Sequence, residues 1–467
     1  MLAGVFILTG VSEVAPLAMN IILGMIVLFL MYSILRRYFS NNAALFTLLM
    51  IIMFTVPIPA LVLSGMEAML QIIVSLCFAW AAAGILSDEE QSFRKSLPLL
   101  ILAPVLTAVR YEGLFLVFVV GLLLILRKRL VYALSLVGLS ILPVIIYGLI
   151  SLAKGWFFMP NSVMLKGHMP DLFSAKGIVK LLGYQCYSHM MSAEHIFVLI
   201  IVAGVVLVFL YGTRTRFWNR SCVLLLVFIA TTCLHLQFAD TGMFFRYEAY
   251  LVTLGLLAIV IGLREVLPRF SVTGLKANPA MYIASVFVLM VSISPIAVRT
   301  ALSIVGPTQA MINTYEQQYQ MGTFLNKYYS GSAVAANDIG AINFLADIHC
   351  VDLFGLGSIE PAQAKRKGRY NTQFIDEFAH SKNTRVAIVY DHWYKSYGGL
   401  PSSWIKAGAW KIRSNIVVGG DMVSFYAVDP AEKQNLIRNL QDFSSYLPNK
   451  VIEMGLYTET KRATEPE

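Results

Sequence analysis

Long apolar runs dominate the first 300 residues of the chain. A helix needs roughly 17–25 apolar residues to cross a bilayer. Eight runs have about that length, near residues 15–36, 43–63, 67–86, 130–152, 194–212, 220–238, 246–263 and 280–299. Two shorter runs, near residues 96–109 and 113–126, flank the polar stretch RYEG. The pattern predicts eight full membrane spans and two segments that are short for a span.

The basic residues indicate whether the two short runs also cross the membrane. If both cross, most Lys and Arg residues of the connecting loops fall on one side, in loops such as RKR at residues 127–129. Loops on the cytoplasmic side are enriched in Lys and Arg. We therefore expect about ten spans, with both chain ends on the outer side.

After about residue 301 the pattern changes. TYEQQYQMGTFLNKYY has the spacing of a polar helix, and SAVAAND, CVDLFG, RVAIVYD and MVSFYAV are short β-like runs. NTQFIDEFAHS, between two of these runs, is helix-like. Strands alternating with helices indicate an α/β domain. The predicted fold is an α-helical polytopic membrane domain at residues 1–301 and an extracytoplasmic α/β domain at residues 302–467.

Composition agrees with a membrane protein. Hydrophobic residues make up 57% of the chain and charged residues 13%, about half of the ~25% charged residues of soluble domains. A formal net charge of +9 would suggest a nucleic-acid partner for a soluble protein. Here the basic residues lie in short loops between apolar runs, so the expected partner is the lipid bilayer and not nucleic acid.

Charged residues also collect at the outer ends of the predicted spans. They are Glu67 in SGMEAML, Arg110 and Glu112 in RYEG, Lys166 in WFFMPNSVMLKG, and Asp240, Arg246 and Glu248 in FADTGMFFRYEAY. Taken singly, a glutamate can complement a helix dipole, an arginine can reach lipid headgroups, and a loop lysine can be solvated. Because several separate outer loops carry such charges, we expect that they face a substrate cavity.

The same stretches carry a family resemblance. SGME, RYEG, MPNSVMLK, FRYEAY and ANDIGAINFLADIHCVDLFGL occur in this order. The series resembles bacterial glycosyltransferases of the GT-C type, in particular the group related to mycobacterial arabinofuranosyltransferases. Tyr111 stands where the family usually has proline, and Ser162 where it usually has threonine. The resemblance implies transfer of a sugar from a polyprenyl-phosphate donor to a glycan or other hydroxyl acceptor, outside the bacterial inner (plasma) membrane.

The resemblance also implies roles for the outer residues. Arg110, Lys166 and Arg246 would hold the donor phosphate, because arginine binds phosphate through paired, charge-assisted hydrogen bonds. The full set of expected substrate-binding residues is Arg110, Glu112, Asn161, Lys166, Asp240, Arg246 and Glu248. No metal-ligand spacing or nucleotide-binding fingerprint is present in the sequence, so no cofactor is expected. The need for a divalent cation stays open.

The general base is the main departure from the family. Its members usually carry the catalytic aspartate in an outer loop before the segment that MLAGVFILTGVSEVAP resembles, so we expect a truncated N-terminus that lacks this base. Glu112, Asp240 and Glu248 have an arginine close in sequence, which lowers the basicity of a carboxylate. Glu67 has no such neighbour, and it is therefore the reserve candidate for the base.

In the outer domain, Asn337, Asp338 and Asp352 fall at predicted strand ends, where open α/β sheets often bind ligands. The same residue types also form turns, so we predict a structural or acceptor-docking role for them. Two other functions stay open: a non-catalytic relative that binds lipid-linked glycan, and a lipid or glycan transporter. Inverted repeats or broken mid-membrane helices would favour a transporter, and the sequence shows neither an internal repeat nor a mid-membrane charge pair.

Overall fold

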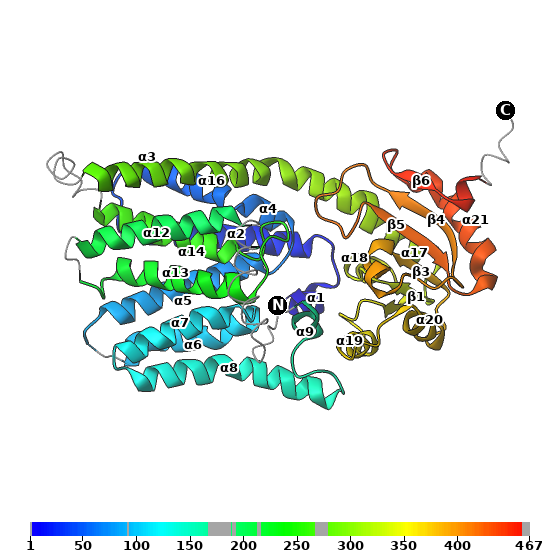
Figure 1. Cartoon of the computed structure of the whole chain (residues 1–467), viewed down its shortest axis with the longest axis horizontal. Helices are drawn as coiled ribbons and strands as arrows, with labels where there is room; N and C mark the ends of the chain where they lie inside the picture. The colour runs from blue at the N-terminus through cyan, green and yellow to red at the C-terminus, as the bar shows by residue number, and fades with distance from the viewer. Residues whose placement is uncertain are drawn as a thin grey trace. The chain divides into compact units, whose positions relative to one another are not determined.

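The computed structural model describes residues 2–90, 93–166, 188, 193–212, 216–266 and 279–459. The chain divides into two compact units (Figure 1). The helical unit comprises Met1–Ile150 and Gly167–Val305, and the α/β unit comprises Ser151–Lys166 and Gly306–Glu467. The boundary lies beyond the expected residue 301, because helix α16 (Pro279–Asn313) continues without a break through it.

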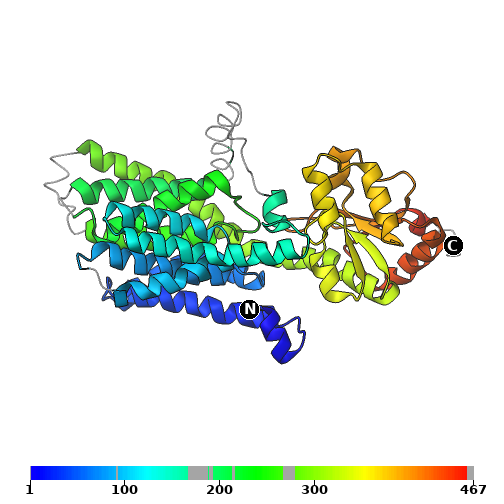
Figure 2. The same ribbon diagram turned by 90° about the horizontal axis from the view of Figure 1, so that it is seen from below.

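The helical unit consists of helices, of which the long ones run side by side and the short N-terminal α1 points away from them (Figure 2). They are α1 (Leu2–Thr9), α2 (Ala15–Leu35), α3 (Asn42–Thr55), α4 (Ile58–Leu63), α5 (Ala68–Ser87), α6 (Phe93–Val109), α7 (Gly113–Leu126), α8 (Leu130–Ala153), α12 (Glu194–Gly212), α13 (Arg220–Phe238), α14 (Ala249–Val266) and the first part of α16. In the part of the chain that the structure describes, α2, α5, α8, α12, α13 and α14 are long and apolar enough to cross a membrane. These six helices confirm a membrane-embedded helical protein.

The apolar run near residues 43–63 differs from its prediction as one span. It forms two helices, α3 and α4, with a break at Val56 and Pro57. Proline has no N–H to donate, and its ring clashes with the preceding turn of a helix. A second proline, Pro59, is tolerated because it stands in the first turn of α4, where N–H groups have no partner in the helix.

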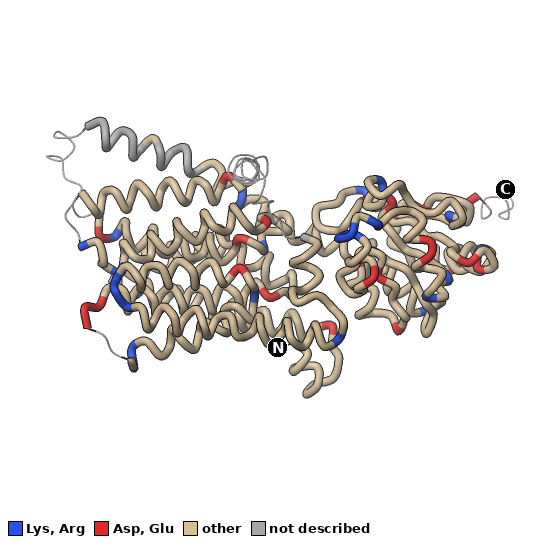
Figure 3. The backbone as a smooth tube through the Cα atoms, turned by 60° about the horizontal axis from the view of Figure 1, so that its bottom comes forward, with Lys and Arg blue, Asp and Glu red and all other residues tan. Residues whose placement is uncertain are grey.

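Among the described residues of the helical unit, the charged ones lie at its two ends, with an uncharged band between them (Figure 3). We call one end the basic end, which contains residues 36–38, 86–89, 127–129 and 216–220. There the Arg129 guanidinium donates to the carbonyl oxygens of Ile85 and Asp88 at the end of α5, at 2.6 and 2.5 Å. We call the other end the RYEG end, which contains residues 67, 110–112, 195, 240–250 and 299.

The α/β unit contains a six-stranded sheet in the order β2-β1-β3-β5-β4-β6. The strands are β1 (Ala333–Ala336), β2 (His349–Asp352), β3 (Val386–Val389), β4 (Ile405–Lys411), β5 (Met422–Ala427) and β6 (Ile452–Met454). Strands β2, β1 and β3 are parallel, and the β3–β5, β5–β4 and β4–β6 pairs are antiparallel. The predicted α/β domain is confirmed, and β4 and β6 add to the four predicted strands.

Helices cover both faces of this sheet. They are α17 (Gln320–Tyr328), α18 (Gly340–Leu345), α19 (Ile359–Arg366), α20 (Thr372–Ser381) and α21 (Lys433–Phe443), with the short helix α9 (Asn161–Lys166) beside α19 and the π-helical turn η3 (Thr314–Tyr319) before α17. Successive strand residues face opposite sides. Thus Val334 and Ala336 pack with α17, α18 and α21, whereas Ala335 packs with α19 and α20.

Candidate functional site

The RYEG turn joins α6 to α7, and the two helices approach each other closely at Gly113. Residues 110–112 form the turn, and the Gly113 N–H donates to the Arg110 carbonyl oxygen at 3.0 Å. A Cβ added at Gly113 would lie 2.7 Å from the Leu106 carbonyl oxygen. A side chain therefore does not fit there, and the glycine lets the chain reverse directly behind Arg110.

Arg110 is the centre of a polar cluster at the RYEG end. Its Nη2 lies 2.6 Å from Glu112 Oε1, and its Nη1 lies 3.8 Å from Glu67 Oε1. Nη1 also donates to Gln71 Oε1 at 3.4 Å. Glu67 has no cation close in sequence, but in space it lies within 4.0 Å of both Arg110 and Arg246, so the sequence argument for Glu67 as a base does not hold.

Arg246 reaches the same cluster from the segment before α14. Its Nε lies 4.0 Å from Glu67 Oε1, which is too far for a hydrogen bond. The Tyr247 ring contacts both arginines: the Arg110 and Arg246 guanidinium carbons lie 4.8 and 5.0 Å from its centre. We call Arg110 and Arg246 the arginine pair. The pair joins cations that are 136 positions apart in the chain around one aromatic ring and one carboxylate.

Arg246 Nε is buried and has no hydrogen-bond partner in the part of the chain that the structure describes. A buried donor on a charged group without a partner is costly, by about 1–3 kcal/mol or more. Proteins keep such groups where a ligand, an ion or water supplies the missing partner. The arginine pair is therefore a candidate anion-binding site.

The segment that carries Arg246 has an unusual backbone. Met243, Phe244 and Phe245 have φ angles of +43°, +57° and +66°, and they follow Gly242 at +91°. Left-handed conformations cost residues with a Cβ roughly 1–2 kcal/mol each. The turn closes with the Arg246 N–H donating to the Gly242 carbonyl oxygen at 3.1 Å. Surrounding contacts must offset the strain of this turn.

Glu248 supplies much of that support. Its Oε2 accepts the Gly242 N–H at 2.8 Å, and its Oε1 lies 2.7 Å from Arg299 Nη1. His195 Nε2 lies 2.9 Å from Arg299 Nη1 and 3.6 Å from Glu248 Oε1. Arg299, and not the Arg246 that is close in sequence, is the arginine that pairs with Glu248. The buried network of Glu248, Arg299 and His195 holds the turn that presents Arg246.

Sequence reasoning missed Arg299 and His195. Both lie inside or beside apolar runs that were interpreted as plain membrane spans. A lone arginine in an apolar helix is itself a signal, because such a charge needs a partner. Arg299 also donates from Nε to the Thr55 carbonyl oxygen at 3.3 Å, at the end of α3. It thereby satisfies a carbonyl group next to the break between α3 and α4.

Asp240 contacts its neighbours through its main chain. Its carbonyl oxygen lies 3.0 Å from His235 Nε2, and His235 Nδ1 lies 3.1 Å from the Tyr250 hydroxyl. His235 and Tyr250 belong to α13 and α14 and are fully buried. Asp240 therefore closes the connection between these two helices.

Asn161 belongs to the α/β unit. Its Nδ2 donates to the Gly355 carbonyl oxygen at 2.9 Å, in the loop after β2, and the residue is 4% exposed. This contact fixes the PNS stretch to the α/β unit and gives Asn161 a structural partner. The side chain of Lys166, the third expected phosphate ligand, lies outside the described residues.

The three candidates of the α/β unit stabilise loops at the carboxyl ends of parallel strands. Asp352 accepts the N–H groups of Phe354 and Gly357 at 2.8 and 2.6 Å. Asn337 Oδ1 accepts the Tyr390 N–H at 3.2 Å and so joins the ends of β1 and β3.

Asp338 Oδ2 accepts from Gln318 Nε2 at 2.5 Å and connects β1 to the π-helical turn η3. These bonds agree with a structural role for all three residues. Within the described residues, no group of three or more His, Cys, Asp or Glu side chains could hold a metal ion.

Together the observations define a membrane-embedded helical protein with a mixed α/β unit and an arginine-centred polar site at one helical end. Residues 309–426 match a family described as "Domain of unknown function (DUF8728)". The match begins in α16 and extends through nearly all of β5. No curated protein matches the chain.

Proposed function

We propose that the protein is a membrane glycosyltransferase that moves a sugar from a polyprenyl-phosphate donor to a glycan or another hydroxyl acceptor. The reaction would take place at the RYEG end, on the extracytoplasmic side of the bacterial plasma membrane. The proposal combines the resemblance of the sequence motifs with the chemistry of the arginine pair.

The orphaned Arg246 donor is the observation that carries the proposal. A polyprenyl-phosphate sugar leaves a phosphate group when its sugar departs. Guanidinium groups stabilise the negative charge of that phosphate by paired hydrogen bonds. Arg246 Nε is buried without a partner among the described residues, while Arg110 approaches the same Tyr247 ring. A phosphate beside Tyr247 would supply the hydrogen-bond acceptor that Arg246 Nε lacks, and the apolar helices would accommodate the polyprenyl tail.

Ten crossings would place this site outside the cytoplasm. Helices α6 and α7 connect the two ends of the helical unit. Lys95, near the start of α6, pairs with Asp88 at the basic end, and Arg110 at the RYEG end directly follows the last residue of α6. Arg127 after α7 returns to Leu86 and Asp88. The 14 residues of α7 extend about 21 Å, so this crossing would rely on neighbouring helices for its burial.

A non-catalytic protein that binds lipid-linked glycan is the second candidate. The observation in its favour is that Glu67 lies within 4.0 Å of both arginines. A carboxylate beside two guanidinium groups can bridge them as an ion-pair partner. Glu67 would then hold the arginines in place, whereas the glycosyltransferase proposal gives it the reserve role of general base.

A transfer assay in proteoliposomes separates these candidates. The full chain receives a radiolabelled polyprenyl-phosphate sugar and a glycan acceptor, and labelled glycan is measured. We expect transfer that falls at least a hundredfold in Arg246→Ala, since a misplaced leaving group costs on that order. Donor binding without any transfer would support the non-catalytic candidate, and lipid movement across the bilayer without transfer would support a transporter.

A further inference from the structure

A second polar site lies at the basic end of the helical unit, away from the arginine pair. It is a cavity of about 790 Å³ lined by residues that include Tyr38, Glu89, Arg127, Arg216, Trp218 and Arg220. These residues come from the ends of α2, α5, α7 and α13 and from the stretch before α13. The volume lies within the usual range for small-ligand sites, about 300–1,000 Å³.

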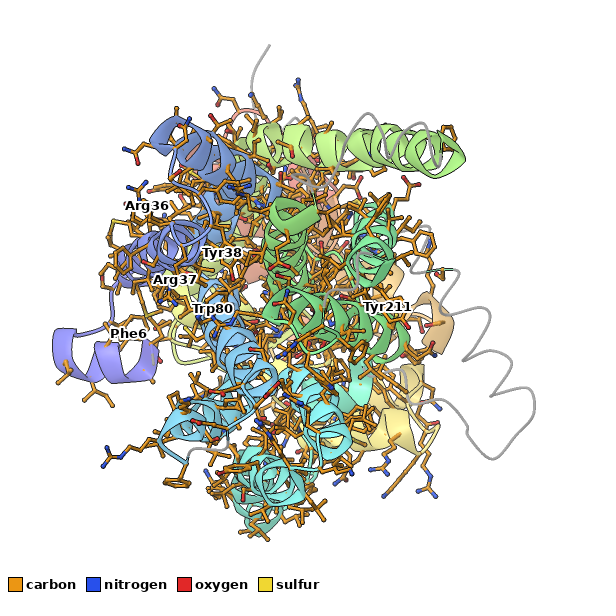
Figure 4. All side chains as sticks on the ribbon, turned by 90° about the vertical axis from the view of Figure 1, so that its left-hand side faces the viewer. Phe6, Arg36, Arg37, Tyr38, Trp80 and Tyr211 are labelled. Carbon is orange, nitrogen blue, oxygen red and sulfur yellow. The ribbon has the colours of Figure 1, made fainter. Side chains whose placement is uncertain are left out.

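Aromatic rings hold two of the cavity's guanidinium groups in place. The Arg127 guanidinium carbon lies 4.9 Å from the centre of the Trp218 ring, and that of Arg220 lies 4.4 Å from the Trp80 ring. Stacking on a ring fixes a guanidinium without using its N–H donors. Trp80, with Tyr38 and Arg37 beside it, is visible at this end of the unit (Figure 4).

The helices around Arg220 leave room for its guanidinium. A Cβ added at Gly84 of α5 would lie 2.9 Å from Arg220 Nη2. Arg127 in addition donates from Nε to the Leu86 carbonyl oxygen at 3.1 Å and from Nη2 to that of Asp88 at 3.2 Å. Both cations are thus positioned by the end of α5 before any ligand binds.

The charge and the depth of the cavity select its ligand. Of its three arginines, Arg216 pairs with the one acid of the lining, Glu89, at 3.0 Å, so Arg127 and Arg220 leave a net positive charge that favours an anion. Its walls are the ends of α5 and α13, two of the helices that can cross a membrane. Tryptophan and tyrosine side chains are typical of the headgroup layer, and Trp218 and Tyr38 lie here. A lipid headgroup beside the ends of these helices would meet the cavity at the membrane surface.

We propose that this cavity binds the phosphate group of an anionic membrane lipid. Basic pockets between the ends of spans bind lipid phosphates in this way. The site is independent of sugar transfer: it needs only the basic end, and it would hold the same ligand in a protein that binds glycan without transferring it. A soluble phosphate compound offers the same chemistry, and the experiment separates the two sources.

Native mass spectrometry of the full chain released from vesicles tests the site. The vesicles contain phosphatidylcholine with a minor fraction of phosphatidylglycerol. We expect one tightly retained phosphatidylglycerol. Arg220→Gln and Arg216→Gln should each reduce its retention roughly tenfold, the size expected for the loss of one charge-assisted hydrogen bond. Arg216 is 86% exposed, so its variant should fold even if Arg220→Gln does not.

Arg36→Gln is the matched control, because Arg36 lies at the same end and is exposed, and its Nη1 donates to Asn42 Oδ1 rather than to the cavity. Retention unchanged in Arg36→Gln but reduced in Arg216→Gln supports the site. Equal losses in both variants would show a diffuse charge effect and overturn it. Displacement of the lipid by millimolar inorganic phosphate would assign the cavity to a soluble phosphate compound and overturn the lipid proposal.

Discussion

Glu248 and Arg299 carry the clearest energetic consequence of any single contact in the helical unit. Their side chains are 1% and 3% exposed, and their charged atoms lie 2.7 Å apart. Two opposite buried charges compensate each other, whereas removing one of them leaves the other buried and unpaired, which is strongly destabilising. The pair also holds the left-handed turn through the Gly242 N–H, so the loss of Glu248 affects both charge balance and backbone.

We predict that Glu248→Gln lowers the free energy of unfolding by about 3–5 kcal/mol, the cost of leaving one buried charge unpaired. The same change at Glu112, whose side chain is 22% exposed, should cost about 1 kcal/mol or less. Denaturant unfolding of the purified protein in micelles measures both. Equal losses would mean that the buried network does not stabilise the turn.

Lys365 of α19 provides a pH-dependent contribution in the α/β unit. Its Nζ donates to the Phe354 carbonyl oxygen at 2.9 Å and lies 3.7 Å from the centre of the Phe354 ring. Burial lowers the pKa of the Lys365 amine to about 8, although the nearby Asp352 carboxylate opposes this. Between about pH 8 and the ordinary lysine pKa of 10.5, the unfolded chain therefore binds more protons than the folded chain.

Stability should rise with pH across that window, because the unfolded state binds the extra proton there. Below about pH 8 the Lys365 amine is protonated in both the folded and the unfolded state, so the cost of burying its charge is fully present. We predict that the melting temperature gains more between pH 8 and 10 in the wild type than in Lys365→Met. Scanning calorimetry at several pH values tests this, and parallel curves for the two proteins would contradict it.

Among single residues, ion pairs between sequence neighbours could be predicted from the sequence, and ion pairs between distant residues could not. Arg110 and Glu112 are two positions apart, and they form the expected contact. Glu248 has Arg246 close in sequence, yet its partner Arg299 is 51 positions away. Spacing in a chain says nothing about which distant helix ends meet, and only the fold brings Arg299, His195 and Glu248 together.

The turn between α6 and α7 is the element on which the candidate site depends. Gly113 lies against the Leu106 backbone, where a Cβ would come within 2.7 Å of the carbonyl oxygen. Gly121, in the same helix α7, would place a Cβ 3.6 Å from Val137, an ordinary contact. The two glycines therefore differ in whether a methyl group fits.

We predict that Gly113→Ala destabilises the protein by about 1–3 kcal/mol, the usual cost of overpacking, and weakens anion binding because Arg110 moves with the turn. Gly121→Ala should be neutral or slightly stabilising, since alanine favours a helix over glycine. Thermal unfolding and phosphate-dependent stabilisation compare them. A Gly113→Ala variant as stable as Gly121→Ala would refute the close packing.

Among the elements, those with strong local signals could be predicted. The long apolar spans and strands β1, β2, β3 and β5 stand out as uninterrupted runs. Strand β4 was missed because IKAGAWK mixes small and charged residues; its Gly408 leaves room for Tyr457, a tertiary packing effect. Strand β6 has three residues and forms only because β4 offers an edge. The break at Pro57 was predictable from its proline.

For the whole molecule, the distribution of charge predicts its orientation. The basic end carries Arg36, Arg37, Arg127, Lys128 and Arg129 beside the ends of apolar helices, a pattern typical of the cytoplasmic side. The ten-crossing topology predicts that the α/β unit is extracytoplasmic. Sequence could suggest this arrangement and a change of pattern near residue 301, but not that one helix, α16, continues across the division after Val305.

We predict that a cysteine replacing the exposed Lys367, in a background without the native cysteines, reacts with a membrane-impermeant maleimide applied to the outside of intact cells. A cysteine replacing the exposed Arg94 should react only after the membrane is permeabilised. Labelling of both variants is measured by a gel shift. Reaction of the Lys367 variant from the cytoplasmic side alone would reverse the topology and with it the location of the proposed active face.

The most direct test of the account is the binding of polyprenyl phosphate to the full chain in nanodiscs. The account predicts that Arg246→Ala and Arg110→Lys each weaken binding by about tenfold or more, because a buried donor or a paired guanidinium contact is lost. Arg36→Ala, at the basic end, should bind like the wild type. Unchanged affinity in both Arg246→Ala and Arg110→Lys would contradict the claim that the arginine pair holds the donor phosphate.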